Sequence, residues 1–169
     1  MKSQLKNRFL EFILQRQLFQ TGDRVLIAVS GGVDSMVLLH LLFRCRKRLK
    51  LELGIVHLHH ELRPGAADAD QELVKTTAEK YHLPFFSLRR SVRSFARDKK
   101  VSLEEAGHLL REMLFTKITK EQGYQKIATA HHLDDQAETV LMRLLLGSGL
   151  SGLAGIRMRK TIWVRPLLF

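Results

Sequence analysis

The stretch VLIAVSGGVDSMVLLHLL, residues 25–42, predicts a buried strand, a glycine turn and a helix in direct succession. Its first five residues are apolar and rich in β-branched side chains, which is typical of a strand inside a sheet. From Met36 onward, apolar residues recur at helical spacing. Gly31 and Gly32 allow a tight turn and a close approach of the backbone to a ligand. We therefore expect the turn to present its amides, with those of the helix N-terminus, to an anion.

The side chains of this turn favour a phosphate ligand over a plain strand–helix junction. Serine hydroxyls flank the two glycines and add hydrogen-bond donors. Asp34 by itself would repel a phosphate, but it fits a site in which Mg²⁺ lies between its carboxylate and the phosphates. The alternative is that Asp34 only caps the helix. The candidate phosphate-binding residues are Ser30, Gly31, Gly32, Val33, Asp34 and Ser35, with Asp34 as the metal ligand.

Two better-known phosphate motifs do not describe this turn. A Walker loop ends in Gly-Lys-Ser/Thr, and no lysine follows the glycines here. The string GSGLSG at residues 147–152 has dinucleotide-loop spacing, but it follows a predicted helix instead of a strand. We interpret it as a loop at a helix end.

The rest of the chain alternates between strand-like and helix-like segments. Strands are predicted at 24–30, 51–60, 83–88 and 126–132, with a further strand beginning near 161. Helices are predicted at 2–19, 35–48, 63–82, 102–123 and 134–147. Such alternation predicts an α/β fold: an open, mainly parallel, twisted sheet with helices on both faces. The length of 169 residues favours a single domain, 1–169.

The net charge of +11 favours a polyanionic partner, and nucleic acid is the usual one. The cations at 44–50 end a predicted helix, where they complement its dipole. Another cluster has no such structural reason, so it is either a phosphate-contacting patch or a solvated face. It comprises Arg89, Arg90, Arg93, Arg97, Lys99 and Lys100, and a smaller basic group comprises Arg157, Arg159, Lys160 and Arg165.

No apolar run reaches the roughly 18 residues that a membrane span needs, so we expect no membrane association. Residues 2–19 carry cations but read better as an amphipathic helix than as a transit peptide. Without a secretory signal, a cytoplasmic protein is expected. The single cysteine, Cys45, can form neither an internal disulfide nor a CxxC site.

Several separated motifs resemble a known enzyme family. SGGVDS at 30–35 resembles the pyrophosphate loop (PP-loop) of the N-type ATP pyrophosphatases, which have a Rossmann-like fold. HLHHELRPGAADAD (57–70), SLEEAGHLLRE (102–112) and IATAHHLDDQAETVLMRLLLGSGLSGLAGI (127–156) resemble the tRNA(Ile)-lysidine synthetases. The resemblance implies ATP and Mg²⁺ as cofactors, and tRNA and free lysine as partners. It also implies a ligase reaction, in which the first anticodon cytidine is adenylated and lysine then displaces AMP.

The same resemblance suggests further site residues. Asp135 occupies the position that the family uses near the reacting centre, which makes Asp34 and Asp135 the candidate catalytic residues. The candidate nucleotide-binding residues outside the turn are His57, Arg63, Arg111 and His131. Because neighbouring strand residues face opposite ways, at most one of His131 and His132 is expected in the pocket. For His57, His59 and His60, a pocket wall or packing is preferred to a zinc site.

Two departures from the family keep other functions open. His108 stands where the family usually has Arg, and Glu112 where it usually has Tyr. Family members also continue past RPLL (165–168) into C-terminal tRNA-binding regions, so this chain is expected to be the N-terminal domain without them. The alternatives are a catalytically silent ATP- or RNA-binding fragment and a tRNA-thiolation enzyme, although the latter needs cysteines. The oligomeric state is open, with a homodimer as one option.

Overall fold

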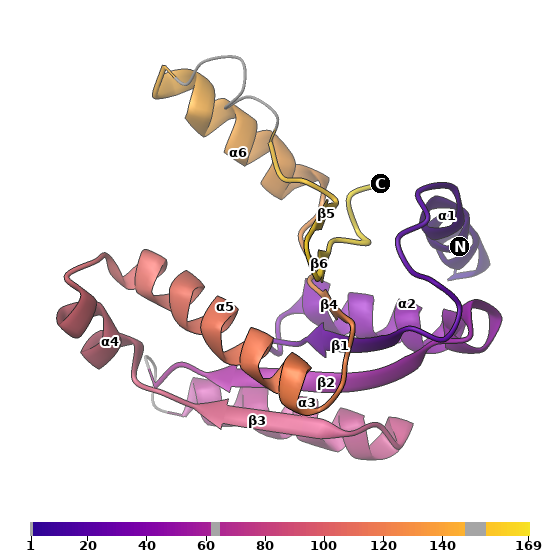
Figure 1. Ribbon diagram of the computed structural model, residues 1–169, viewed down its shortest axis with the longest axis horizontal. Helices are drawn as coiled ribbons and strands as arrows, with labels where there is room; N and C mark the ends of the chain where they lie inside the picture. The colour runs from indigo at the N-terminus through magenta and orange to yellow at the C-terminus, as the bar shows by residue number, and fades with distance from the viewer. Residues whose placement is uncertain (1, 62–64, 148–154) are drawn as a thin grey trace.

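A six-stranded, mostly parallel sheet forms the centre of the protein (Figure 1). The computed structural model describes residues 2–61, 65–147 and 155–169. The strand order is β3-β2-β1-β4-β6-β5, and only β5 is antiparallel to its neighbour. The strands are β1 (Arg24–Ala28), β2 (Glu52–His59), β3 (Phe85–Arg89), β4 (Lys126–Ala128), β5 (Arg159–Lys160) and β6 (Trp163–Val164). The predicted α/β fold class is confirmed.

Six helices are described, five of them near their predicted positions. They are α1 (Lys2–Gln15), α2 (Val33–Leu49), α3 (Ala66–Tyr81), α4 (Val92–Lys99), α5 (Leu103–Glu121) and α6 (Leu133–Leu145). The short α4 lies within the predicted basic patch and was not expected. Ser91 caps it by accepting a hydrogen bond from the Ser94 amide, while Val92 and Ala96, four residues apart, face the core.

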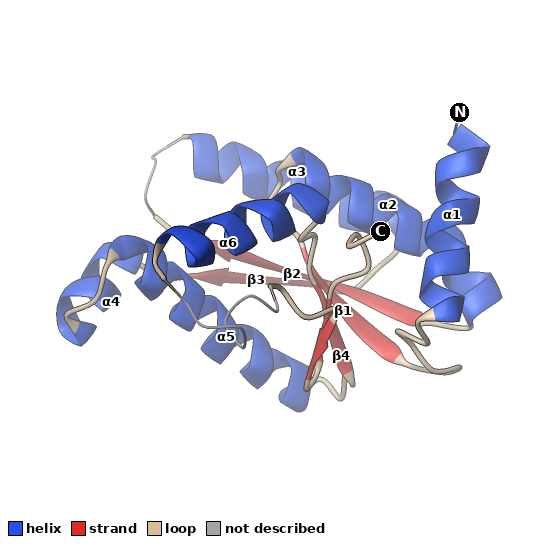
Figure 2. Ribbon diagram, turned by 90° about the horizontal axis from the view of Figure 1, so that it is seen from above, coloured by secondary structure: helices blue, strands red, loops and turns tan. Residues whose placement is uncertain are grey.

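Helices lie on both faces of the sheet (Figure 2), and each face carries its own apolar core. Alternation along β1 shows this directly, because Val25 and Ile27 belong to one core and Leu26 to the other. The first core includes residues of α1, α2 and α3, and the second includes residues of α4 and α5. Helices therefore cover both faces, as predicted.

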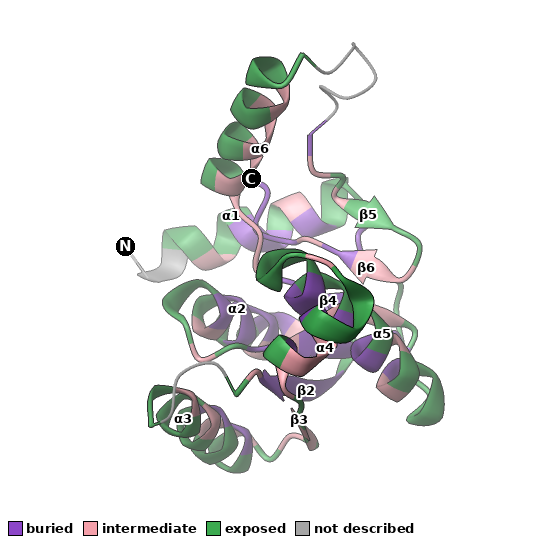
Figure 3. Ribbon diagram, turned by 90° about the vertical axis from the view of Figure 1, so that its left-hand side faces the viewer, coloured by how far each residue is buried: buried purple, intermediate pink, exposed green. Residues whose placement is uncertain are grey.

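Helix α6 differs from the others because none of its residues is buried (Figure 3). It begins beside the carboxyl end of β4 and extends away from the sheet (Figure 1). In the described part of the chain, no helix combines the length and the apolar character that a bilayer span requires.

The strand order reverses at β1, which lies between β2 and β4. In open parallel sheets such a reversal opens a crevice beyond the carboxyl ends of the strands, where ligands bind. The glycine turn follows β1, and the segment containing Asp135 follows β4. The topology therefore brings the two predicted groups of site residues to one place.

Candidate functional site

A cavity of about 310 Å³ lies at this crevice, beyond the ends of β1, β2 and β4. Seven predicted site residues line it: Ser30, Gly32, Asp34, Ser35, Arg111, His131 and Asp135. Gly31 and Val33 belong to the same turn. The remaining lining residues are Ala28, Val29, Leu58, His60, Phe115, Thr129 and Ala130. The cavity thus has an apolar side, suited to a nucleoside, and a polar side at the turn.

The glycine turn is braced by its own hydroxyl groups. Ser35 Oγ donates to the Gly32 carbonyl oxygen at 2.8 Å and accepts from the Ser30 amide at 3.2 Å. Gly31 has φ +98°, a conformation that favours glycine. Gly32 is the N-cap of α2 and provides no side-chain cap. The alternative role of Asp34 as the helix cap is therefore not observed, and the first amides of α2 are left for an anion.

The carboxylates of Asp34 and Asp135 both lie near the imidazole of His132. His132 Nε2 lies 3.7 Å from Asp34 Oδ2 and 3.7 Å from Asp135 Oδ2. The Asp34 side chain is 56% exposed and that of Asp135 is 37% exposed. Two carboxylates from different strand ends therefore border the same cavity, with an imidazole beside both.

Asp135 has a structural task as well. Its Oδ2 accepts a hydrogen bond from the His132 amide at 2.8 Å, while His132 Nδ1 accepts from the Asp134 amide at 3.2 Å. This reciprocal pair is a capping box at the start of α6. The helix N-terminus thus fixes the position of the Asp135 carboxylate at the cavity wall.

His131 and Arg111 line the same cavity as the turn. Thr129 Oγ1 and His131 Nδ1 are 3.0 Å apart, which fixes the ring. Burial lowers the pKa of His131, and the nearby charge of Arg165 adds to this effect. Burial also lowers the pKa of Arg111, although a guanidinium stays charged at neutral pH. Of the two adjacent histidines only His131 lines this cavity, as alternation predicts.

His57 does not line the cavity, contrary to expectation. It is 3% exposed, and its Nδ1 lies 2.8 Å from the Val29 carbonyl oxygen. Burial lowers the pKa of His57, so a neutral, packed ring is favoured. His60, at the end of the same segment, lines the cavity instead. Arg63, the other residue predicted here, lies outside the described residues.

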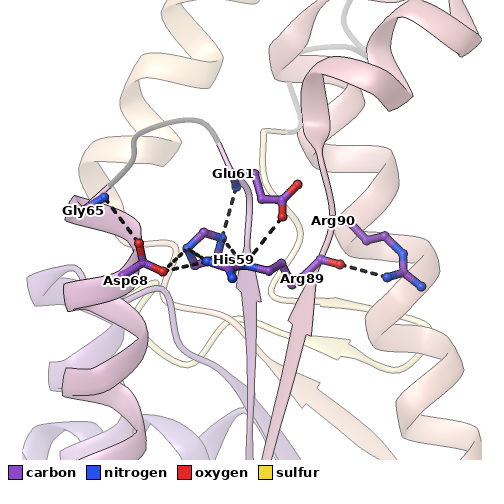
Figure 4. Close-up of polar contacts among 6 residues, drawn as sticks. All are labelled: His59, Glu61, Gly65, Asp68, Arg89 and Arg90. Carbon is purple, nitrogen blue, oxygen red and sulfur yellow. Dashed lines mark hydrogen bonds and ion pairs between the residues drawn. The ribbon is translucent and has the colours of Figure 1, made fainter.

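His59 belongs to a charged cluster that ties the ends of β2 and β3 to the start of α3 (Figure 4). Arg89 Nη2 lies 2.6 Å from Asp68 Oδ1, and Arg89 Nε lies 3.6 Å from Glu61 Oε1. His59 Nε2 lies 3.2 Å from the same Asp68 oxygen. Arg89, predicted as part of a phosphate-contacting patch, is thus engaged by two carboxylates. Across the described ranges, no three His, Cys, Asp or Glu side chains are grouped to hold a metal ion.

The sequence motifs did not reveal every residue at the site. Phe115 and Thr129 were missed as lining residues, although Thr129 lies within a segment that carries the family resemblance, whereas His60 has the pocket-wall role that was one of its two preferred roles. Asp70 of α3 was missed as well: a Cβ at Gly31 would lie 2.8 Å from the Asp70 Cβ. A contact between residues this far apart in the chain leaves no local signal.

We expect the thermal stability to fall as the pH is lowered from about 6.5 to 4, in part because of His60. Burial lowers the pKa of His60 to about 4, and the positive charge of Arg111 contributes. Between these pH values the unfolded chain binds a proton that the folded protein excludes, so protonation favours unfolding. Melting temperatures across this pH range measure the effect.

The control for this prediction is His108→Gln, because the His108 side chain is 70% exposed. His60→Gln should flatten the pH dependence, and His108→Gln should leave it nearly unchanged. An equal pH dependence in the His60→Gln variant would show that burial of His60 does not contribute.

Comparison with known proteins places the chain in a family. It is 43% identical to the tRNA(Ile)-lysidine synthase of Chlorobaculum tepidum over 96% of this chain and 49% of that protein. It is 42% identical to the Geobacter sulfurreducens enzyme of the same name over 93% of this chain and 34% of that protein. The chain thus spans half or less of the length of these relatives.

A solved structure shares the fold. The U34-tRNA thiolase NcsA from Methanococcus maripaludis, with its [4Fe-4S] cluster, superposes with a TM-score of 0.75 at 20% identity. The match covers 97% of this chain and 58% of that chain. The sequence model of the PP-loop domain matches residues 1–169, so the chain belongs to the PP-loop domain family.

Proposed function

We propose that the protein ligates lysine to the first anticodon cytidine of a tRNA, using ATP and an adenylated cytidine intermediate. The observation that carries the proposal is one cavity bordered by the PP-loop turn, Asp34, Asp135 and Arg111. The relatives named tRNA(Ile)-lysidine synthase support the substrates. A tRNA substrate would place the protein in the cytoplasm.

The turn suits the leaving group of the first step. A cytidine oxygen forms a bond to the α-phosphorus of ATP, and the bond from that phosphorus to the pyrophosphate oxygen breaks. Backbone amides at Gly31–Val33 and the α2 N-terminus would bind the departing pyrophosphate. Arg111, which lines the same cavity, would neutralise charge that develops on the α-phosphate.

In the second step the lysine amine attacks the adenylated carbon, and AMP leaves with the bonding electron pair. The attacking nitrogen must lose a proton, and a carboxylate at the cavity wall suits both holding the amine and accepting that proton. We assign this task to Asp135, whose carboxylate the α6 capping box positions.

The residues present fit a bound Mg²⁺ ion. Magnesium usually takes one or two protein carboxylates together with phosphate oxygens and water, and not an all-protein cage. Asp34 is the candidate ligand because it borders the cavity at the turn itself, and Asp135 lies nearby. When bound, the ion would offset the negative charge of the phosphates.

The basic residues of α4 are the proposed contact for the tRNA backbone. Arg93, Arg97, Lys99 and Lys100 are exposed on or directly after this helix. Arg89 is left out of this surface because Asp68 and Glu61 engage it. Charge reversal of Arg93 and Arg97 should reduce tRNA affinity at moderate salt, and unchanged binding would argue against this surface.

Thiolation is the less favoured alternative for this domain. Cys45, the only cysteine in the sequence, is fully buried in α2 and is not among the residues lining the cavity. Burial raises the pKa of its thiol, which opposes formation of a reactive thiolate. A catalytically silent ATP- or RNA-binding role is favoured by one observation, the replacement of two usual family residues by His108 and Glu112.

The decisive experiment measures AMP release from ATP with tRNA and lysine each present or omitted. The proposed ligase should release AMP only when both substrates are present, and should exchange pyrophosphate with ATP when tRNA alone is added. A silent module would bind ATP without either reaction. AMP release without lysine, or with a sulfur donor only, would contradict lysine ligation.

A further inference from the structure

A second, smaller cavity shares three lining residues with the 310 Å³ cavity, which is called the ATP cavity from here on, and none of its lining residues belongs to the turn. It has a volume of about 50 Å³ and lies between α5 and the β5–β6 hairpin. Its lining residues are His108, Arg111, Glu112, Thr129, His131, Lys160, Trp163 and Arg165. Arg111, Thr129 and His131 also line the ATP cavity. A ligand in the small cavity would therefore lie directly behind the wall of the ATP site.

The charge of this cavity is strongly positive. Arg111, Lys160 and Arg165 carry permanent positive charges, and His108 and His131 add imidazoles. The single acidic lining residue is Glu112, whose Oε2 lies 3.9 Å from His108 Nε2. Because that acid already faces an imidazole, the three permanent cations outweigh it.

The two arginines are partly buried, and neither forms an ion pair with an acidic side chain within the described residues. Burial lowers the pKa of both Arg111 and Arg165. Arg165 Nη1 donates to the Arg157 carbonyl oxygen at 2.7 Å, but its Nε is buried and has no hydrogen-bond partner among the described residues. Holding two guanidinium groups in such a place is costly unless an anion completes the site.

The volume limits the size of that anion. A cavity needs about 10–15 Å³ to accept one water molecule, so 50 Å³ accommodates an oxyanion the size of phosphate but not a nucleoside. Guanidinium groups bind phosphate oxygens with paired hydrogen bonds, which matches the two arginines. The half-exposed indole of Trp163 adds a flat surface on which a base can stack.

We propose that this cavity binds one backbone phosphate of the RNA substrate, next to the nucleotide that reacts in the ATP cavity. The inference rests on the proposed function, since it assigns the acceptor side of that reaction. ATP is the less suitable source of the phosphate, because no residue of the PP-loop turn that suits its pyrophosphate is among the residues lining the small cavity. With its phosphate held behind this wall, the target nucleotide would reach the ATP cavity past His131.

The test compares RNA and ATP binding in cavity variants. We expect Arg165→Met to weaken binding of an anticodon stem-loop RNA about tenfold, and to lower the slope of log affinity against log salt by about one. Lys160→Gln, an exposed position, should weaken RNA binding in the same direction without endangering the fold. Lys117→Gln on the same helix α5, but outside the cavity, serves as the control for loss of one charge.

Two further variants should gain RNA affinity, a result that general damage to the protein would not produce. His108→Arg adds a permanent cation and Glu112→Gln removes the repelling carboxylate, so each should strengthen RNA binding several-fold. His108→Gln adds no charge and should not strengthen RNA binding. Equal RNA affinity in all these variants would overturn the proposal.

Separate arms identify the source of the phosphate. Mg-ATP affinity should stay within about twofold in Arg165→Met and Lys160→Gln, and added inorganic phosphate should weaken RNA binding. Loss of ATP affinity equal to the loss for RNA would assign the cavity to ATP and overturn the proposal. If the unaltered protein binds Mg-ATP but no RNA, both the proposed function and this inference fail. If the protein binds RNA and the cavity variants do not change the RNA affinity, only this inference fails.

Discussion

Replacing Asp34 with Asn should lower the rate of AMP formation by about 100- to 1,000-fold and remove the Mg²⁺ dependence of ATP binding. Asp34 is the carboxylate at the PP-loop turn and borders the ATP cavity. Asparagine keeps the shape of the side chain but loses the charge that balances a divalent cation beside the phosphates. Calorimetric titration of ATP, with and without Mg²⁺, measures the binding effect.

Asp134→Asn is the matched control. Asp134 also lies near His132, at 3.9 Å from its Nδ1, but its side chain is 92% exposed and does not line the ATP cavity. Both variants lose one negative charge near the same imidazole. A larger loss of ATP binding or AMP formation in Asp34→Asn would therefore come from a direct role of Asp34 at the cavity. Because the Asp34 side chain is 56% exposed, its loss should leave the melting temperature nearly unchanged. Mg²⁺-dependent ATP binding equal to that of the unaltered protein would refute the metal role.

Local patterns were sufficient to predict the turn and its position in the fold. Residues 25–42 contain an apolar run, two glycines and a helical repeat, and each of these patterns predicts the local structure of the segment in which it occurs. The structure has a strand ending at Ala28 and a helix beginning at Val33. Since the carboxyl ends of parallel strands share one edge, the approach of Asp34 and Asp135 also followed from topology.

Other features depend on contacts that no local pattern reports. His57 and His60 are equivalent as residue types, and only the tertiary structure buries the first against Val29 while the second lines the cavity. In the basic run at 89–100, neither helix α4 nor the ion pair between Arg89 and Asp68 could be predicted from the charge pattern. Charge and composition indicate a surface, but a carboxylate from another element decides which cations remain available to a ligand.

Gly31→Ala should destabilise the protein by about 1–3 kcal/mol and weaken ATP binding at least tenfold. Gly31 has φ +98°, which an alanine adopts only with strain. An added Cβ would also lie 2.8 Å from Asp70 Cβ, 2.8 Å from Asp70 Oδ1 and 2.9 Å from Asp70 Cγ. Rotation of the Asp70 side chain would move its carboxylate but not its Cβ, so the turn or α3 must shift. Denaturant unfolding and ATP titration measure the two effects.

The neighbouring glycine provides the control. Gly32 has φ −67°, and within the described residues a Cβ there would meet only Ser30 Oγ, at 3.4 Å. Gly32→Ala should therefore cost less than about 1 kcal/mol of stability, within the range of a changed N-cap residue. If both alanine variants lose the same stability, the special conformation of Gly31 is not the cause.

A double-mutant cycle separates the strain from the contact with Asp70. Asp70→Gly removes the Cβ that an alanine at position 31 would meet, at a cost of about 1 kcal/mol for a glycine within α3. Combined with Gly31→Ala, it should restore the part of the stability lost to the contact, so the double variant loses less than the sum of the single ones. The stability loss that remains in the double variant, beyond the cost of Asp70→Gly alone, measures the strain of a positive φ for an alanine in the turn. This strain should keep ATP binding weak in the double variant, because phosphate recognition depends on the direction of the turn amides. Strict additivity would show that α3 does not constrain the turn.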